Sequence, residues 1–238
     1  MLPAYNPRES NSTHYKPHLP SNALRIKAGA FILGVIALPI AANVVWRSEH
    51  VVFWIVFEVI TVIPALLLVV WLVHRGVSLR MLGLSDPRRT FTDGQVIAFS
   101  GLALILFAVV GALAIFVESF FGFVEPEPPP VPEGLAGMLT IVYYSLTAAL
   151  VEETLFRGVP AALVLIDESE RNRLTYILAS GVAFGAWHES YGWSVAIACA
   201  LVGFAVAALY VAIRNLWPLI AAHFAYDVWA FWPLLPSS

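Results

Sequence analysis

The sequence predicts an all-α, polytopic membrane protein with about seven transmembrane helices, because of its composition, its long apolar runs and the sidedness of its charges. The chain has 238 residues, of which 60% are hydrophobic and 12% are charged, and its mean hydropathy is +0.80. Soluble domains are typically about 45–50% apolar and about 25% charged. These values exclude a soluble globular domain, a disordered chain and a disulfide-stapled secreted domain.

Charge and cysteine content exclude further classes of protein. The formal net charge is only −3, which gives no electrostatic support for a nucleic-acid partner. The single cysteine, Cys199, lies in an apolar run. The chain can therefore form neither an intrachain disulfide nor a cysteine metal cluster.

The elements follow in order along the chain. Residues 1–24 are polar and rich in Pro, Asn and Ser, and we expect them to form a disordered tail. A bilayer core of about 30 Å needs about 20 apolar residues in a helix. Residues 25–134 then form an N-terminal region with three spans, and residues 135–238 form a C-terminal helical bundle that holds the active site. Seven stretches qualify as spans, some of them marginally: residues 27–46, 51–73, 96–117, 135–157, 174–189, 194–213 and 216–235.

The basic residues favour one orientation in the membrane. If the N-terminus is cytoplasmic and the spans alternate, only Arg47 of the 13 Lys and Arg residues lies outside, as the positive-inside rule requires. Residues 118–134 carry several glutamates, a Pro-rich run and no base, which predicts a semi-rigid outside loop. We expect a multi-pass protein of a prokaryotic cell membrane, surrounded by membrane lipid.

Ionisable side chains within the predicted spans mark the candidate site, because such a group is costly in a membrane and usually has a function. For Glu58 we expect a structural or helix-pairing role, since the sequence names no partner for it. All the ionisable residues of the predicted spans other than Glu58 fall in the C-terminal half of the chain. The full set is Glu58, Glu152, Glu153, His188, His223 and Asp227.

The adjacent glutamates of the fourth span divide into two roles. Glu153 and Arg157 are four residues apart on one helix face, so we expect them to form an ion pair. Glu152 is turned by about 100° from Glu153 on a regular helix. It is therefore expected to stay free for chemistry. The alternative is that all three residues form an interfacial salt-bridge cluster.

Two later segments carry histidines, and one of these, His188, is expected to lie at a similar depth in the membrane to Glu152. Glu170 lies in the charged turn after the fourth span. Glu152 lies 18 residues before Glu170, and His188 lies 18 residues after Glu170. In an antiparallel helical hairpin, such equidistant residues face each other. His223 and Asp227 share one face of the last span. The alternatives are a hydrogen-bonded core histidine for His188 and a purely structural pair of His223 with Asp227.

This set of side chains suits the activation of a water molecule within the membrane. Glu152 would act as the general base, His188 would hold the water, and His223 would stabilise the oxyanion of an attacked carbonyl. No cofactor is expected, but the same residues are alternative ligands for a divalent metal such as Zn²⁺: Glu152, His188, His223 and Asp227. The HExxH and GxSxG motifs are absent, and Cys199 is not next to a histidine in the sequence.

Three motifs in this order resemble those of the CPBP family of intramembrane proteases, also called the CAAX-protease or abortive-infection (ABI) family. The motifs are Glu152-Glu153-xxx-Arg157, Phe184-xxx-His188 and His223-xxx-Asp227, and Gly158 and Gly185 fit as well. The resemblance covers about residues 135–235. It implies an intramembrane endopeptidase with Glu152 as the base, His188 as its partner and His223 as an oxyanion donor. Glu153, Arg157 and Phe184 would support the site.

The resemblance also implies a class of substrate. Eukaryotic members remove the last three residues of prenylated CAAX proteins, and prokaryotic members process other peptides, so we expect a membrane-associated or prenylated-like substrate. The family's last motif often ends in Asn, whereas this chain has Asp227, which fits if it is protonated, orients His223 or binds a metal. Two other interpretations stay open: a non-catalytic scaffold or immunity-like factor of the same fold, and a small transporter or channel.

Overall fold

The computed structural model describes residues 21–30, 34, 51–122, 131, 133–165 and 169–234, with the backbone alone for residues 51–58, 60, 190 and 234. All regular structure within these ranges is helical, which confirms the predicted all-α fold. Residues 22–24, expected in the tail, belong to a helical segment over residues 22–30. The rest of the predicted tail, most of the first predicted span and the Pro-rich part of the predicted outside loop lie outside the described residues.

The described helices follow the apolar runs of the sequence closely. The chain continues from α4 through a π-helical turn, Thr154–Gly158, into α5 without an intervening loop. The 3-10 turn Glu189–Tyr191 separates α6 from α7. The helices are α2 (Val51–His74), α3 (Asp93–Phe121), α4 (Gly134–Glu153), α5 (Val159–Val164), α6 (Glu170–Trp187), α7 (Trp193–Ile213) and α8 (Trp217–Phe231).

Three helices of the described part are long and apolar enough to cross a membrane: Asp93–Phe121, Gly134–Val164 and Trp193–Ile213. The other predicted spans coincide with elements that are shorter, more polar or only partly described. The last of them, α8, has 15 residues, and α6 begins with a charged turn that contains Glu170, Arg171 and Arg173. These helices make the chain a helical membrane protein, and α6 and α8 complete the bundle around the long apolar helices.

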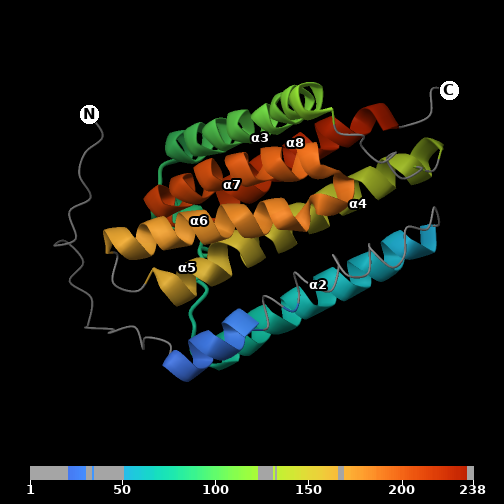
Figure 1. The fold of residues 1–238 in the computed structure, drawn as a ribbon. Helices are drawn as coiled ribbons and strands as arrows, with labels where there is room; N and C mark the ends of the chain where they lie inside the picture. Colours follow the sequence, from blue (N-terminus) through green and yellow to red (C-terminus); the bar gives the residue numbers. More distant parts are fainter. Residues whose placement is uncertain are drawn as a thin grey trace.

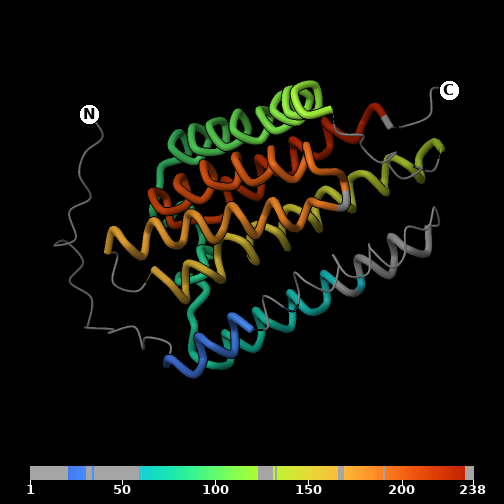
Figure 2. Tube along the Cα trace, viewed as in Figure 1, coloured from blue at the N-terminus to red at the C-terminus, as the bar shows by residue number. Residues whose placement is uncertain are grey.

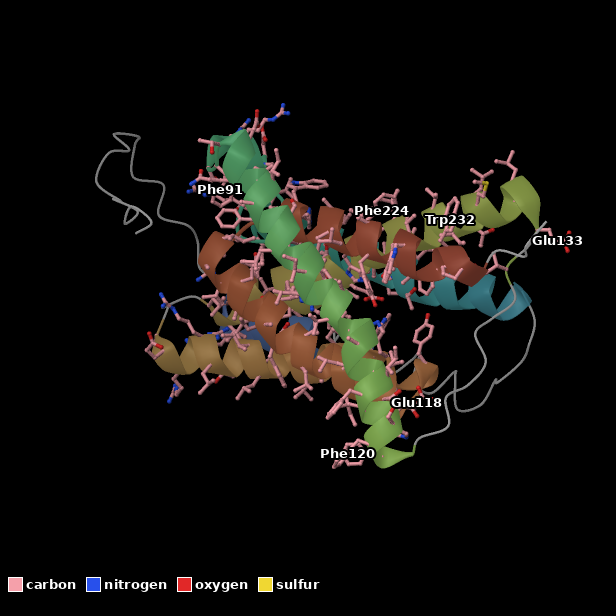
Figure 3. The ribbon with its side chains drawn as sticks, turned by 90° about the horizontal axis from the view of Figure 1, so that it is seen from above. Phe91, Glu118, Phe120, Glu133, Phe224 and Trp232 are labelled. Atoms are coloured by element: carbon pink, nitrogen blue, oxygen red, sulfur yellow. The ribbon has the colours of Figure 1, made fainter. Side chains whose placement is uncertain are left out.

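The helices pack side by side in a bundle (Figure 1). Helices α6 and α7 form an antiparallel hairpin, α7 also packs on α3, and α8 packs on both α3 and α4. Helix α2 runs along the side of the bundle away from α3, where it contacts α4 (Figure 2). Seen from above, Phe91 lies near the start of α3, and Glu118 and Glu133 lie toward the opposite side of the molecule (Figure 3).

Glycines allow the close approach of α6 and α7. A Cβ atom on Gly185 would lie 2.6 Å from the carbonyl oxygen of Ala196 and 2.6 Å from the Cβ of Ala200. A Cβ atom on Gly203 would lie 3.0 Å from the Cα of Gly181. Small residues at such a crossing let helix backbones pack closely within a membrane protein. Because Gly185 lies one helical turn before His188, this contact also sets the position of the candidate site.

Candidate active site

The segment that carries the two glutamates departs from regular α-helix directly after them. Thr154–Gly158 forms a π-helical turn, in which the backbone N–H of Val159 bonds to the carbonyl of Thr154. Such turns leave carbonyl groups without their usual α-helical partners and are frequent at functional sites. Helix α6 supplies donors, since the Ser180 hydroxyl donates to the Phe156 carbonyl over 2.6 Å and the Tyr176 hydroxyl to the Arg157 carbonyl over 3.2 Å.

Glu153 is fully buried and bonds both to Arg157 of its own motif and to His223 of the third motif. Its Oε1 accepts a hydrogen bond from Nη1 of Arg157 at 3.1 Å, so the predicted ion pair is present. The same oxygen accepts a hydrogen bond from Nδ1 of His223 at 2.8 Å. The Arg157 guanidinium also lies over the Phe184 ring, 4.1 Å from its centroid. Glu153 is thus tied to a cation on its own helix and to the imidazole of α8.

Glu152 points to a different set of partners. Its Oε1 accepts a hydrogen bond from the indole N–H of Trp187 at 3.1 Å. Its Oε2 is buried, has no hydrogen-bond partner among the described residues, and lies 3.7 Å from Nε2 of His188 and 3.8 Å from Nε2 of His223. One oxygen of this carboxylate is therefore occupied, and the other faces two imidazole nitrogens.

His188 follows the last residue of α6 and turns its ring toward Glu152. Its Nδ1 is 2.8 Å from the carbonyl oxygen of Phe184, to which an Nδ1–H donates. The neutral ring then carries its lone pair on Nε2, the nitrogen that faces Glu152. The separation of 3.7 Å between Nε2 and Oε2 agrees with the similar depth that the sequence predicts for these two residues.

His223 is held from three sides. In addition to the hydrogen bond to Glu153, its ring stacks on Phe107 of α3, with centroids 4.5 Å apart. Its Nε2 lies 3.5 Å from Oδ2 of Asp227, one turn further along α8. The two ring nitrogens of His223 therefore have different neighbours: Nδ1 is hydrogen-bonded to Glu153, and Nε2 lies near both Asp227 and Glu152.

These contacts leave a group of acceptor atoms facing one another. Oε2 of Glu152, Nε2 of a neutral His188 and Oδ2 of an ionised Asp227 all lack a hydrogen to donate. A water molecule has two hydrogens to give to such a group, and a doubly protonated His223 supplies a third through Nε2. Carboxylates on both sides of the His223 ring favour that charged form. The arrangement is suited to hold and deprotonate a water molecule.

The described residues contain no group of three or more His, Cys, Asp and Glu side chains placed to hold a metal ion. The alternative of a Zn²⁺ ion bound by the four converging residues stays a prediction.

The structure brings the residues of all three predicted motifs together and adds two that the sequence analysis did not find. One is Trp187, whose signal in the sequence is an N–H donor within an apolar run, directly before His188. Phe107 carries no signal, since it is one of many apolar residues of α3. Glu58 lies within α2, and its side chain lies outside the described residues.

The region that holds this site matches a known family. Residues 134–229 match the family model of Rce1-like proteins, described as type II CAAX prenyl endopeptidase Rce1-like. This region belongs to the CAAX protease family. The match begins at the start of α4 and ends within α8, so it contains Glu152, His188 and His223 and leaves out α2 and α3. No curated protein and no solved structure gives a significant match to the chain.

The family assignment supports an intramembrane endopeptidase acting on membrane-associated peptides in general. The helices of the CAAX protease region agree with a membrane location. Gly134–Val164, with Glu152 and Glu153, and Trp193–Ile213 are both long and apolar enough to cross a membrane.

Proposed function

We propose that the CAAX protease region of this chain is a glutamate-type intramembrane endopeptidase, in which Glu152 activates a water molecule for attack on a peptide carbonyl. The observation that carries the proposal is the unpartnered Oε2 of Glu152, which lies 3.7 Å and 3.8 Å from the two imidazole Nε2 atoms. Oε2 of Glu153 is likewise buried without a donor, so it is the two nearby imidazole nitrogens that favour Oε2 of Glu152 as the site for a water molecule.

In the proposed reaction, a water molecule lies between Oε2 of Glu152 and Nε2 of His188. Glu152 accepts one proton of the water while the oxygen forms a bond to the carbonyl carbon. The carbonyl π electrons move onto the oxygen, which becomes an oxyanion. When the C–N bond breaks, the amine leaves with the proton that Glu152 had accepted, and the carboxylate is restored.

His223 stabilises the developing oxyanion in this scheme. Its Nδ1–H is engaged by Glu153, so Nε2–H of the charged ring is the donor available to the oxyanion. Phe107 stacks on one face of this ring and limits its rotation. Glu153 and Arg157 are positioning residues, because they hold the His223 ring and contribute no atom to the reaction.

Asp227 replaces the Asn found in many members of the family. Its Oδ2 lies 3.5 Å from Nε2 of His223, which supports a role in holding the charged form of that ring. If Asp227 instead carries a proton, its hydroxyl is a second donor for the oxyanion. Both arrangements support a water-based mechanism, and a metal-bound arrangement is the alternative.

The substrate class follows from the family and from the location of the site. We propose a membrane-associated protein or peptide, of CAAX type or related to it, that reaches the site from the membrane. Glu152 and Glu153 lie on a helix long and apolar enough to span the bilayer, and both are buried. A substrate held at the membrane by a lipid group or an apolar segment would reach such residues more readily than a freely soluble peptide.

The test is cleavage by the purified full chain in liposomes. An internally quenched, farnesylated CAAX peptide is compared with the same peptide lacking the farnesyl group, and products are identified by mass spectrometry. We expect release of a C-terminal tripeptide from the farnesylated peptide and unchanged activity after dialysis against a metal chelator. No cleavage of either peptide would contradict the CAAX-type proposal. Loss of activity on chelation with recovery on Zn²⁺ addition would replace the water-based mechanism by the metal-dependent one.

A further inference from the structure

We infer that Trp187 is a positioning residue that fixes the plane of the Glu152 carboxylate, so that one of its oxygens faces the two histidines. The inference rests on the proposed role of Glu152. Trp187 is the last residue of α6 and is 5% exposed. Its indole N–H donates to Oε1 of Glu152 at 3.1 Å. The two residues are 35 positions apart in the sequence and are brought together by the packing of α6 against the π-helical turn that follows α4.

The hydrogen bond makes the two carboxylate oxygens unequal. Oε1 has a donor, whereas Oε2 has none and is the oxygen near both histidines. A carboxylate can rotate about its last side-chain bond, so without a donor its plane could turn until neither oxygen faces His188. The indole fixes one orientation. It therefore keeps the free oxygen within reach of a water molecule on Nε2 of His188.

The surroundings of Trp187 make the indole a rigid donor. Its ring packs edge-on against Phe156 of the π-helical turn, with centroids 5.6 Å apart. Phe156 is itself buried, and its carbonyl accepts the hydrogen bond from Ser180 of α6. The same α6 segment that presents His188 thus also presents the donor to Glu152. One element fixes both sides of the proposed water site.

The test replaces the indole by a ring that packs but cannot donate. In the liposome assay, Trp187→Phe should lower kcat by about 10- to 100-fold, the effect of removing a hydrogen bond to a charged group, while KM changes little. Trp217→Phe, at the start of α8, is the matched control and should keep full activity. A kcat of Trp187→Phe within about twofold of wild type would overturn the inference.

Two further measurements separate this inference from the proposed function. If Glu152→Gln keeps full activity, the proposed function is wrong. If Glu152→Gln is inactive but Trp187→Phe is fully active, the proposed function stands and only the role of Trp187 is overturned. Ultraviolet resonance Raman spectra test the contact without any substrate. The difference spectrum of wild type minus Trp187→Phe should show a strongly hydrogen-bonded indole, which becomes weakly bonded in the Glu152→Leu background. An identical indole band in both backgrounds would contradict the inference.

Discussion

His223 donates a hydrogen bond from Nδ1 to Oε1 of Glu153 over 2.8 Å, across the interface of α4 and α8. The second glutamate of the pair thereby connects the first and the third sequence motif. Because the same Glu153 oxygen also accepts from Arg157, a single buried carboxylate holds a guanidinium and an imidazole in place. The adjacent carboxylate of Glu152 stays available for the reaction.

Replacement of Glu153 by Gln should affect stability as well as activity. The change leaves the fully buried Arg157 without a charged partner, which for a buried ion pair costs about 3–5 kcal/mol. We expect a lower melting temperature in detergent and loss of cleavage. Glu118→Gln, at the exposed end of α3, is the matched control and should change neither. A stable and active Glu153→Gln protein would contradict the role given to this residue.

Replacement of His223 by Gln tests the oxyanion donor. Loss of one such donor typically lowers kcat by about 100- to 1,000-fold, and we expect this effect with little change in KM, because the donor acts mainly in the transition state. Steady-state cleavage of the farnesylated peptide in liposomes measures both constants. A rise in KM at unchanged kcat would instead place His223 in substrate binding.

Asp227→Asn should retain activity. The amide keeps a polar group of the same size near Nε2 of His223 and, unlike an ionised carboxylate, can donate to an oxyanion. The measurement combines the cleavage rate with metal analysis of the purified protein. If the variant lost both activity and a bound metal ion, the water-based mechanism would have to be given up.

Gly185→Ala should destabilise the protein and move His188. The added methyl group would meet the backbone oxygen of Ala196 and the side chain of Ala200, each at 2.6 Å, and overpacking of this kind costs about 1–3 kcal/mol. The control is Gly101→Ala on α3, where an added Cβ meets nothing within 4 Å. Thermal unfolding should give a clearly lower melting temperature for Gly185→Ala than for Gly101→Ala. Equal melting temperatures would show that α6 and α7 do not approach as closely as described.

Ser180→Ala should weaken the π-helical turn. It removes the hydroxyl that donates to the Phe156 carbonyl, and a buried carbonyl without a donor costs about 1–3 kcal/mol. Ser119→Ala removes a hydroxyl that bonds only within its own exposed helix end, to the Ile115 carbonyl, and should be neutral. Hydrogen exchange of the backbone amides of Thr154–Gly158 reports the change locally. Unchanged exchange in the Ser180 variant would contradict the role of that hydroxyl.

Much of the helical fold follows from the sequence by simple physical rules. The long apolar runs become α3, α4 with α5, and α7, because a bilayer requires continuous helices with internal hydrogen bonds. The pairing of Glu153 with Arg157 follows from their spacing of four residues. The similar depth of Glu152 and His188 follows from their equal distances to the turn between two antiparallel helices.

Other features depend on contacts between helices and could not be read from the chain. The hydrogen bond of His223 to Glu153 joins residues 70 positions apart, and no local pattern marks it. The π-helical turn after Glu153 depends on donors from Tyr176 and Ser180 on another helix. The stacking of Phe107 on His223 comes from a helix outside the family match, where one aromatic residue among many apolar ones carries no distinguishing signal.

The most direct test of the central claim compares Glu152→Gln with Glu133→Gln in the liposome cleavage assay. Both variants remove one carboxylate from the same helical segment, but Glu133 is exposed at the start of α4 and caps no backbone group. General-base catalysis contributes about 100- to 10,000-fold, so Glu152→Gln should lower kcat/KM at least 100-fold, while Glu133→Gln matches wild type. Equal kcat/KM for Glu152→Gln and wild type would contradict Glu152 as the base.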